Sequence, residues 1–99
     1  MKAYMLSFTS KSGNLTRQNI LDYLDTRSEV LNWYAVMPFT IILVSAQTQS
    51  TLTELLRLRF GNEITFLLAK VESNTINGFI NEQVWNFINN PKSSGRWNN

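Results

Sequence analysis

Three acidic residues in one short stretch are the side chains of this sequence best suited to catalysis. The chain contains neither histidine nor cysteine, so an acid, a base or a metal ligand would have to be Asp or Glu. Asp22 and Asp25 stand three positions apart and share one side of a helix, and Glu29 follows them. Arg17 and Arg27 flank the pair, which is typical of a solvated helix face. We therefore predict no catalytic residue, no metal site and no cofactor. The two missing residue types also exclude disulfides, thiol nucleophiles and Ser-His-Asp catalysis.

Basic side chains are the second candidates. Nine Lys or Arg residues against seven acids give a net charge of +2, and no basic run concentrates them. Arg57 and Arg59 lie two positions apart and so point to different sides of a helix. The segment Ser10-Lys11-Ser12-Gly13-Asn14 resembles a phosphate-holding turn but lacks the spacing of a P-loop. The candidate contacts to nucleic acid are Lys11, Arg17, Arg57 and Arg59.

Aromatic residues could stack on bases, as they do in the RNA-recognition motif. The candidates are Trp33, Tyr34, Trp85 and Trp97. That motif needs a glycine and several aromatics on its third strand, whereas residues 39–46 contain one aromatic and no glycine. We therefore interpret Trp33 and Trp85 as anchors in a core or an interface.

Hydrophobic periodicity predicts the elements that would carry these residues. Pro38 separates two strands, because a proline inside a central strand would remove a ladder hydrogen bond; a single bent strand is the alternative. Thr51 and Glu54 have the spacing of a capping box, and Gly61 ends that helix. The predicted order is strand 2–9, helix 15–28, strands 30–37 and 39–46, helix 51–60, strand 63–71, and a short helix from Asn81 to Asn90.

This βαββαβ order predicts an α+β, ferredoxin-like fold. Its four-stranded antiparallel sheet would carry two helices on one face, with a short C-terminal helix added. Residues 1–90 form the predicted single domain, and residues 91–99 form a flexible tail.

The predicted sheet has apolar residues on both faces. Tyr4, Leu6, Phe8, Ile41, Leu43, Phe66 and Leu68 would face the helices. The opposite set is Met5, Ile42, Val44, Leu67 and Val71. A patch of this size marks an interface, so we expect a homodimer that stacks its sheets or shares an edge strand. The alternative is a C-terminal segment that folds back across the sheet.

Nothing in the sequence predicts a membrane protein. The first eight residues lack the charged and apolar regions of a signal peptide. The longest apolar stretch, residues 35–46, is interrupted and is shorter than the roughly 20 residues of a spanning helix. We therefore expect a cytoplasmic protein.

The apolar pattern and two tryptophans resemble a known family. The chain looks like the small bacterial SinR-family proteins, relatives of the VapD toxins and of the small CRISPR-associated adaptation endonuclease. The matching features are Tyr4-Met5-Leu6-Ser7-Phe8, Trp33, residues 39–44, Thr48 with the helix of Leu52, Leu55 and Leu56, residues 66–71, and Trp85.

The resemblance implies a ferredoxin-like homodimer. For the nuclease members it also implies an Asp at the end of the first strand that binds a divalent metal across the dimer axis. The matching position here is Thr9, and a neutral hydroxyl does not replace that carboxylate.

The leading hypothesis is therefore a non-catalytic homodimeric binding protein of the defence or toxin-antitoxin type, with a protein or a nucleic acid as its partner. One alternative is a weak metal-dependent ribonuclease that uses Asp22, Asp25 or Glu29. Another is an inhibitory protein of phage or mobile-element origin that binds a host protein.

Overall fold

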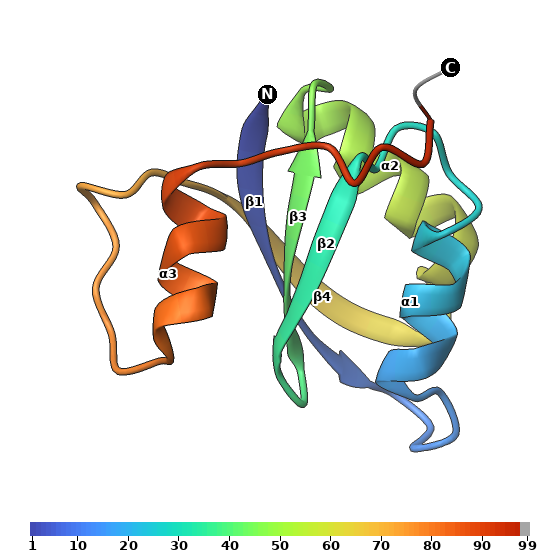
Figure 1. Cartoon of the computed structure of the whole chain (residues 1–99). Coiled ribbons are helices and arrows are strands. Elements are labelled where there is room, and N and C mark those ends of the chain that lie inside the picture. Colours follow the sequence, from blue (N-terminus) through green and yellow to red (C-terminus); the bar gives the residue numbers. More distant parts are fainter. Residues whose placement is uncertain (98–99) are drawn as a thin grey trace.

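A computed structural model describes residues 1–97 and shows an α+β arrangement of one antiparallel sheet and three helices (Figure 1). The elements are β1 (Lys2–Ser10), α1 (Arg17–Leu24), β2 (Asn32–Met37), β3 (Thr40–Ser45), α2 (Gln49–Phe60), β4 (Ile64–Val71) and α3 (Glu82–Asn89). No helix within residues 1–97 has the length and apolar character needed to cross a membrane.

The four strands lie in the order β2-β3-β1-β4. β1 is central and pairs antiparallel with both neighbours, so that Leu6 lies opposite Ile41 on β3 and Leu68 on β4. β2 and β3 form the hairpin predicted around Pro38, and the alternative of one bent strand is wrong. This arrangement is compatible with the predicted ferredoxin-like plan.

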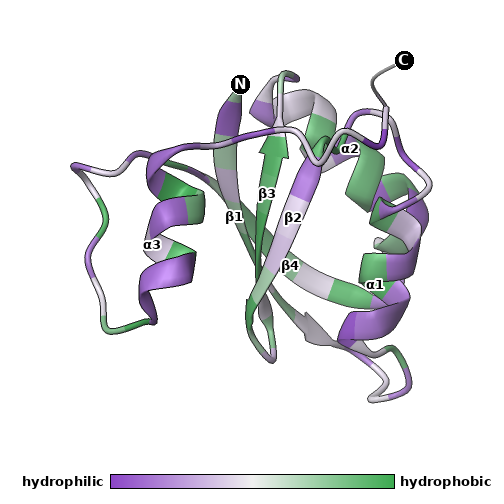
Figure 2. Cartoon of the chain, in the orientation of Figure 1, coloured by the Kyte–Doolittle hydropathy of each residue, from purple (hydrophilic) through white to green (hydrophobic). Residues whose placement is uncertain are grey.

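One face of the sheet packs against α1 and α2 (Figure 1). The strand residues predicted to face the helices all lie in or against this cluster. Leu6, Ile41 and Leu43 are fully buried there, and Figure 2 shows β3 as a hydrophobic strand between the two layers. We call this side the inner face.

The other side, the outer face, is partly covered by α3, which lies across the sheet from α1 and α2 (Figure 1). Val84 and Ile88 of this helix are buried against Ala3, Ile42 and Val71. The chain thus follows, for this part of the face, the alternative of a C-terminal segment that folds back across the sheet. Within one chain, α3 supplies apolar contacts that a stacked second sheet would otherwise make.

Threonines cap both α1 and α2, but neither helix begins where the sequence predicts. Thr16 caps α1 in a capping box with Asn19, so the helix starts two residues later than predicted and ends at Leu24. Thr48 caps α2 by accepting from the Thr51 backbone amide, which places the first turn three residues before the predicted box. Glu54, the glutamate of the predicted box, pairs with Arg57 instead. Gly61 caps the C-terminus of α2 as predicted.

The segment predicted to be a flexible tail makes specific contacts. The Ser94 amide donates to the Leu31 carbonyl at 2.9 Å, and the Asn32 side chain donates to the Lys92 carbonyl at 3.1 Å. Trp97 Nε1 donates to the Val30 carbonyl at 3.2 Å. Residues 92–97 are therefore tied to the start of β2, and residues 98–99 of the predicted tail lie outside the described residues.

Candidate functional site

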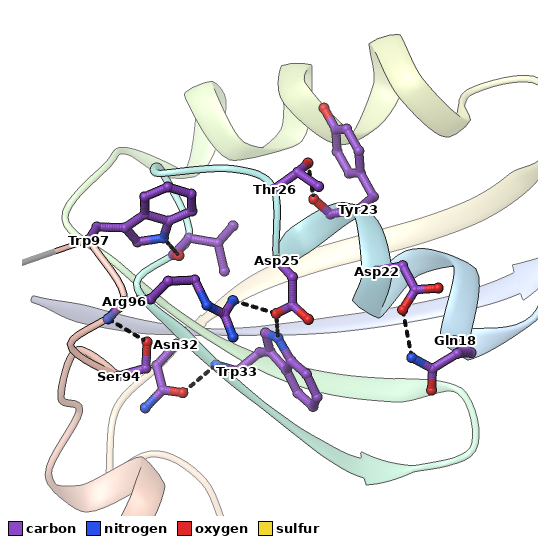
Figure 3. Close-up of polar contacts among 11 residues, drawn as sticks. Gln18, Asp22, Tyr23, Asp25, Thr26, Asn32, Trp33, Ser94, Arg96 and Trp97 are labelled. Carbon is purple, nitrogen blue, oxygen red and sulfur yellow. Dashed lines mark hydrogen bonds and ion pairs between the residues drawn. The ribbon is translucent and has the colours of Figure 1, made fainter.

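The three candidate carboxylates do not share partners: Asp22 and Asp25 have different hydrogen-bond donors (Figure 3), and Glu29 pairs with Arg27. Asp22 accepts a hydrogen bond of 2.7 Å from Gln18 one turn earlier. Asp25 accepts from Trp33 Nε1 at 2.7 Å and also from Arg96. Within residues 1–97 no group of three or more acidic residues is placed to hold a metal ion.

Glu29, the third carboxylate, is held by Arg27 in a two-pronged ion pair with N–O distances of 3.2 and 3.0 Å. Hydrogen bonding from this guanidinium lowers the pKa of Glu29. At Asp25, burial acts to raise the pKa, but the hydrogen bonds from Trp33 and Arg96 outweigh it, so the pKa is lowered. A carboxyl group that donates a proton near neutral pH needs a raised pKa instead. These two carboxylates thus have the environment of structural ion pairs.

Asp25 connects two distant parts of the chain (Figure 3). It receives its two hydrogen bonds from Trp33 on β2 and from Arg96 near the C-terminus, 71 positions away in sequence. One carboxylate therefore fastens both β2 and the C-terminal segment to the end of α1. We call Asp25, Trp33 and Arg96 the C-terminal latch.

Each of the four basic candidates is engaged within the chain. Lys11 Nζ donates to the Gly61 carbonyl at 3.0 Å, where it satisfies the end of α2. Arg17 donates to the Met37 carbonyl at 3.0 Å, across to the β2–β3 hairpin. These two cations stabilise the junctions between elements.

The other two candidates lie on α2 and pair with neighbouring acids. Arg57 binds Glu54 one turn earlier, and Arg59 lies 3.4 Å from Glu63. Arg59 also stacks over the Phe60 ring, with 4.7 Å to its centroid. Charge neutralisation by the two acids weakens the attraction that this helix end exerts on phosphate.

The loop between β1 and α1 uses its own hydroxyl groups to satisfy its backbone. The Gly13 amide donates to Ser10 Oγ at 3.0 Å, and the Asn14 amide donates to Ser12 Oγ at 3.3 Å. Gly13 has a positive φ of 76°, the backbone region that favours glycine. The two amides that a phosphate-holding turn would offer are thus already bonded.

The aromatic candidates are also engaged within the chain. Trp33 packs on the inner-face core, while Tyr34 and Trp85 pack on the outer-face core. The Tyr34 ring meets the Phe87 ring edge-on, with 5.5 Å between centroids. From the sequence we interpret Trp33 and Trp85 as anchors in a core or an interface, and both pack against a core of the chain.

Thr9, the position of the family's metal-binding Asp, lies near the end of β1 opposite Thr65 of β4. Both threonines are exposed. The outer face at this end of the sheet therefore carries neutral hydroxyl groups.

The five residues of the predicted dimer face have different environments. Ile42, Val44 and Val71 are buried within the single chain. Met5 packs against the outer-face core. Leu67 alone is largely exposed, at 77%, because α3 covers the other end of the sheet (Figure 1). Of these five residues, Leu67 is thus the one that a second chain can reach readily.

Leu67 is in the middle of β4, which is an edge strand of the sheet. The Lys11 amide donates to the Glu63 carbonyl at 2.8 Å, so the odd-numbered residues of β4 direct their backbone groups to β1. The even-numbered residues direct theirs away from the sheet. In agreement, the Leu68 carbonyl accepts a hydrogen bond from the Gln49 side chain of α2 rather than from β1.

This free edge is long and almost uncharged. Its sequence, ITFLLAKV, has one charged residue, Lys70, which pairs with Glu72 at 3.2 Å. Edge strands of this kind are templates for pairing with another strand. Sequence reasoning identified Leu67 but missed the backbone groups of Phe66, Leu68 and Lys70, since their role depends on β4 lying at the edge.

Comparisons with protein-family models, with curated proteins and with solved structures give no match to this chain. The relationship to the SinR-family proteins therefore stays a prediction.

Proposed function

We propose that this protein is a non-catalytic binding protein of the defence or toxin-antitoxin type, with a ferredoxin-like fold, that works as a homodimer joined through the free edges of its two β4 strands. The observation that carries the proposal is the exposed Leu67 at the centre of a nearly uncharged edge strand. Cytoplasmic residence is part of the proposal, and cell fractionation tests it.

The edge favours one symmetric register. In an antiparallel pair centred on Leu67, the two copies of this side chain lie opposite each other on the outer face, at a pair without direct hydrogen bonds, where side chains approach most closely. Phe66 of each copy then lies opposite Leu68 of the other. Both are half-buried on the inner face, so the pairing extends an existing apolar layer.

The same register avoids a clash of charges. Lys70 lies opposite Ile64 of the second copy, far from the other Lys70. The carbonyl of Leu68, already bonded to Gln49, can accept a second hydrogen bond because a carbonyl has two lone pairs. Shared edges are also compatible with α3, whereas stacked sheets would compete with it for the outer face.

A protein partner is favoured over a nucleic acid. The candidate cations Lys11, Arg17, Arg57 and Arg59 are each held by an acid or a carbonyl of the same chain. A salt titration of DNA and RNA binding tests this choice, since phosphate contacts produce a steep loss of affinity with salt. Binding with such a slope would contradict it. The alternative of a phage-derived inhibitor also needs a protein partner. Identification of a host protein bound to this chain would support that alternative.

The ribonuclease alternative has no comparable support, because Asp22, Asp25 and Glu29 are each held in a separate contact. RNA cleavage with Mg²⁺ or Mn²⁺ that is lost in Asp22→Ala or Asp25→Ala would revive it. Equal residual activity in both variants would remove those assignments.

Sedimentation at micromolar concentration tests the homodimer. We expect the wild type to sediment as a dimer and Leu67→Lys as a monomer, because the substitution places two ammonium groups opposite each other across the axis. Leu58→Lys is the matched control, since Leu58 is a similarly exposed leucine, at 72%, on α2. It should remain a dimer. A monomeric wild type, or a dimer that survives Leu67→Lys, contradicts the proposal.

A further inference from the structure

An apolar cavity lies between the outer face of the sheet and the chain that connects β4 to α3. Its volume is about 220 Å³. The sheet lines it with Met5, Thr40 and Ile42 of β1 and β3 and with Val36 and Met37 of β2, and α3 adds Trp85 and Ile88. Residues 76–80 complete the lining. No charged side chain takes part, so the cavity suits a neutral occupant.

Thr40, on the sheet side of the cavity lining, has a hydroxyl that can distinguish between occupants. Thr40 is nine-tenths buried, at 9% exposure, and its hydroxyl makes no hydrogen bond within residues 1–97. No fully enclosed side-chain oxygen or nitrogen in the same range lacks a partner. The Thr40 hydroxyl therefore retains accessible space, and the space that this residue lines is the cavity. A hydroxyl that opens onto the cavity can donate or accept one hydrogen bond there, which favours an occupant with a matching polar group.

The connecting chain provides a route of entry. The hydrogen bonds of residues 73–80 within the described chain are local, such as Thr75 to the Glu72 carbonyl and the Gly78 amide to Asn77. None ties this segment to the sheet. The Phe79 side chain is fully exposed beside the cavity. A segment held mainly by its side chains can open locally without loss of the sheet.

We infer that this cavity binds a small neutral molecule with one compact aromatic or aliphatic body and one hydroxyl or N–H group, which hydrogen-bonds to Thr40. An apolar cavity of about 150 Å³ accepts benzene, so 220 Å³ holds a substituted single ring. A site of this size has no room for a peptide backbone. The inference concerns a site separate from the β4 edge and does not depend on dimerisation.

Titration of the full-length protein with p-cresol and p-xylene, followed by NMR at the Trp85 indole N–H and the isoleucine methyl groups, tests the inference. The two probes have nearly the same shape and differ in one hydroxyl. We expect saturable shifts around the cavity, with p-cresol bound about two- to tenfold more tightly, the range for one neutral hydrogen bond. Failure of both probes to give saturable shifts there, or shifts confined to residues outside the cavity lining, overturns the inference.

Two variants separate the hydroxyl from the cavity. Thr40→Val should reduce p-cresol affinity to that of p-xylene and leave p-xylene binding unchanged, while Val36→Phe should fill the space and abolish the binding of both. Equal discrimination in wild type and Thr40→Val contradicts the role of Thr40, and this comparison stands even if Val36→Phe does not fold. Phe79→Ala should bind like the wild type. Binding that appears only in Phe79→Ala would mean that the Phe79 ring occupies the cavity, and it would overturn the inference.

Discussion

Asp25 has a carboxylate of the kind that catalysis or metal binding needs, but its contacts give it a structural role. Its carboxylate accepts from Trp33 and Arg96, and these donors favour the ionised form. Asp22 lies one turn away and accepts its hydrogen bond from Gln18 of the same helix. Spacing in sequence predicted that the two acids share a helix side, but it contained no information about partners on β2 and near the C-terminus.

The C-terminal latch gives a prediction with a built-in control. Asp25→Asn should lower the free energy of unfolding by about 1 kcal/mol, the value for hydrogen bonds to a charged group after discounting for partial exposure. Asp22→Asn should change it by less than about 0.5 kcal/mol. Urea denaturation at neutral pH measures both values. Equal effects of the two substitutions would contradict the latch.

The latch also has a pH dependence. Because the pKa of Asp25 is lower in the folded protein than in the unfolded chain, its contribution is present above the unfolded pKa and is lost as the pH falls through the folded one. The difference between wild type and Asp25→Asn should therefore shrink below about pH 4. Urea denaturation across pH 3 to 7 measures this change. A stability difference between wild type and Asp25→Asn that grows at acidic pH would contradict the prediction.

At the scale of elements, local patterns predicted most of the structure. Alternation on β1 and β4 separated the inner from the outer face correctly, because period-two burial is a property of the strand itself. The start of α2 was predicted three residues late, since both Thr48 and Thr51 are acceptable caps and Glu54, the partner of the predicted box, binds Arg57 instead. The docking of α3 on the sheet was left as one of two alternatives. That choice depends in part on packing against Ala3 and Ile42, which are more than 40 positions from Val84 in sequence, and periodicity has no signal for such contacts.

The N-terminus of α2 tests which threonine caps the helix. Thr48→Ala should destabilise the protein by about 1 kcal/mol, because it leaves the Thr51 amide without its acceptor. Thr51→Ala should cost less, since the side chain of this residue caps no backbone amide. Thermal or urea unfolding of the two variants compares them directly. A larger loss of stability in Thr51→Ala than in Thr48→Ala would mean that Thr51 caps the helix, as the sequence predicted.

The cover provided by α3 leads to a second prediction at this scale. Ile88→Ala removes a side chain that is buried against the outer face, and the cavity it leaves should lower the free energy of unfolding by about 2 to 4 kcal/mol. Asn86→Ala, an exposed position on the same helix, should have little effect. Urea denaturation measures both. A negligible loss in Ile88→Ala would mean that α3 does not pack stably on the sheet.

At the scale of the whole molecule, helices cover the faces of the sheet, whereas β4 lies at its edge and pairs with one strand, β1. The inner face is covered by α1 and α2, part of the outer face by α3, and the start of β2 is bonded to residues 92–94. The β4 edge keeps free backbone groups and the exposed Leu67. The apolar patch predicted on the outer face includes Leu67, and we move the proposed interface from that face to the edge of the sheet.

A single engineered cysteine gives the most direct measurement of this edge, because the natural chain contains none. In the proposed register the two Leu67 Cα atoms lie about 4.5 Å apart, within the range that a disulfide spans. Leu67→Cys should form a disulfide-linked dimer rapidly under mild oxidation, whereas Leu58→Cys, at a similarly exposed position, should stay mainly monomeric on non-reducing gels. Cross-linking of Leu67→Cys no faster than that of Leu58→Cys would contradict a homodimer joined through β4.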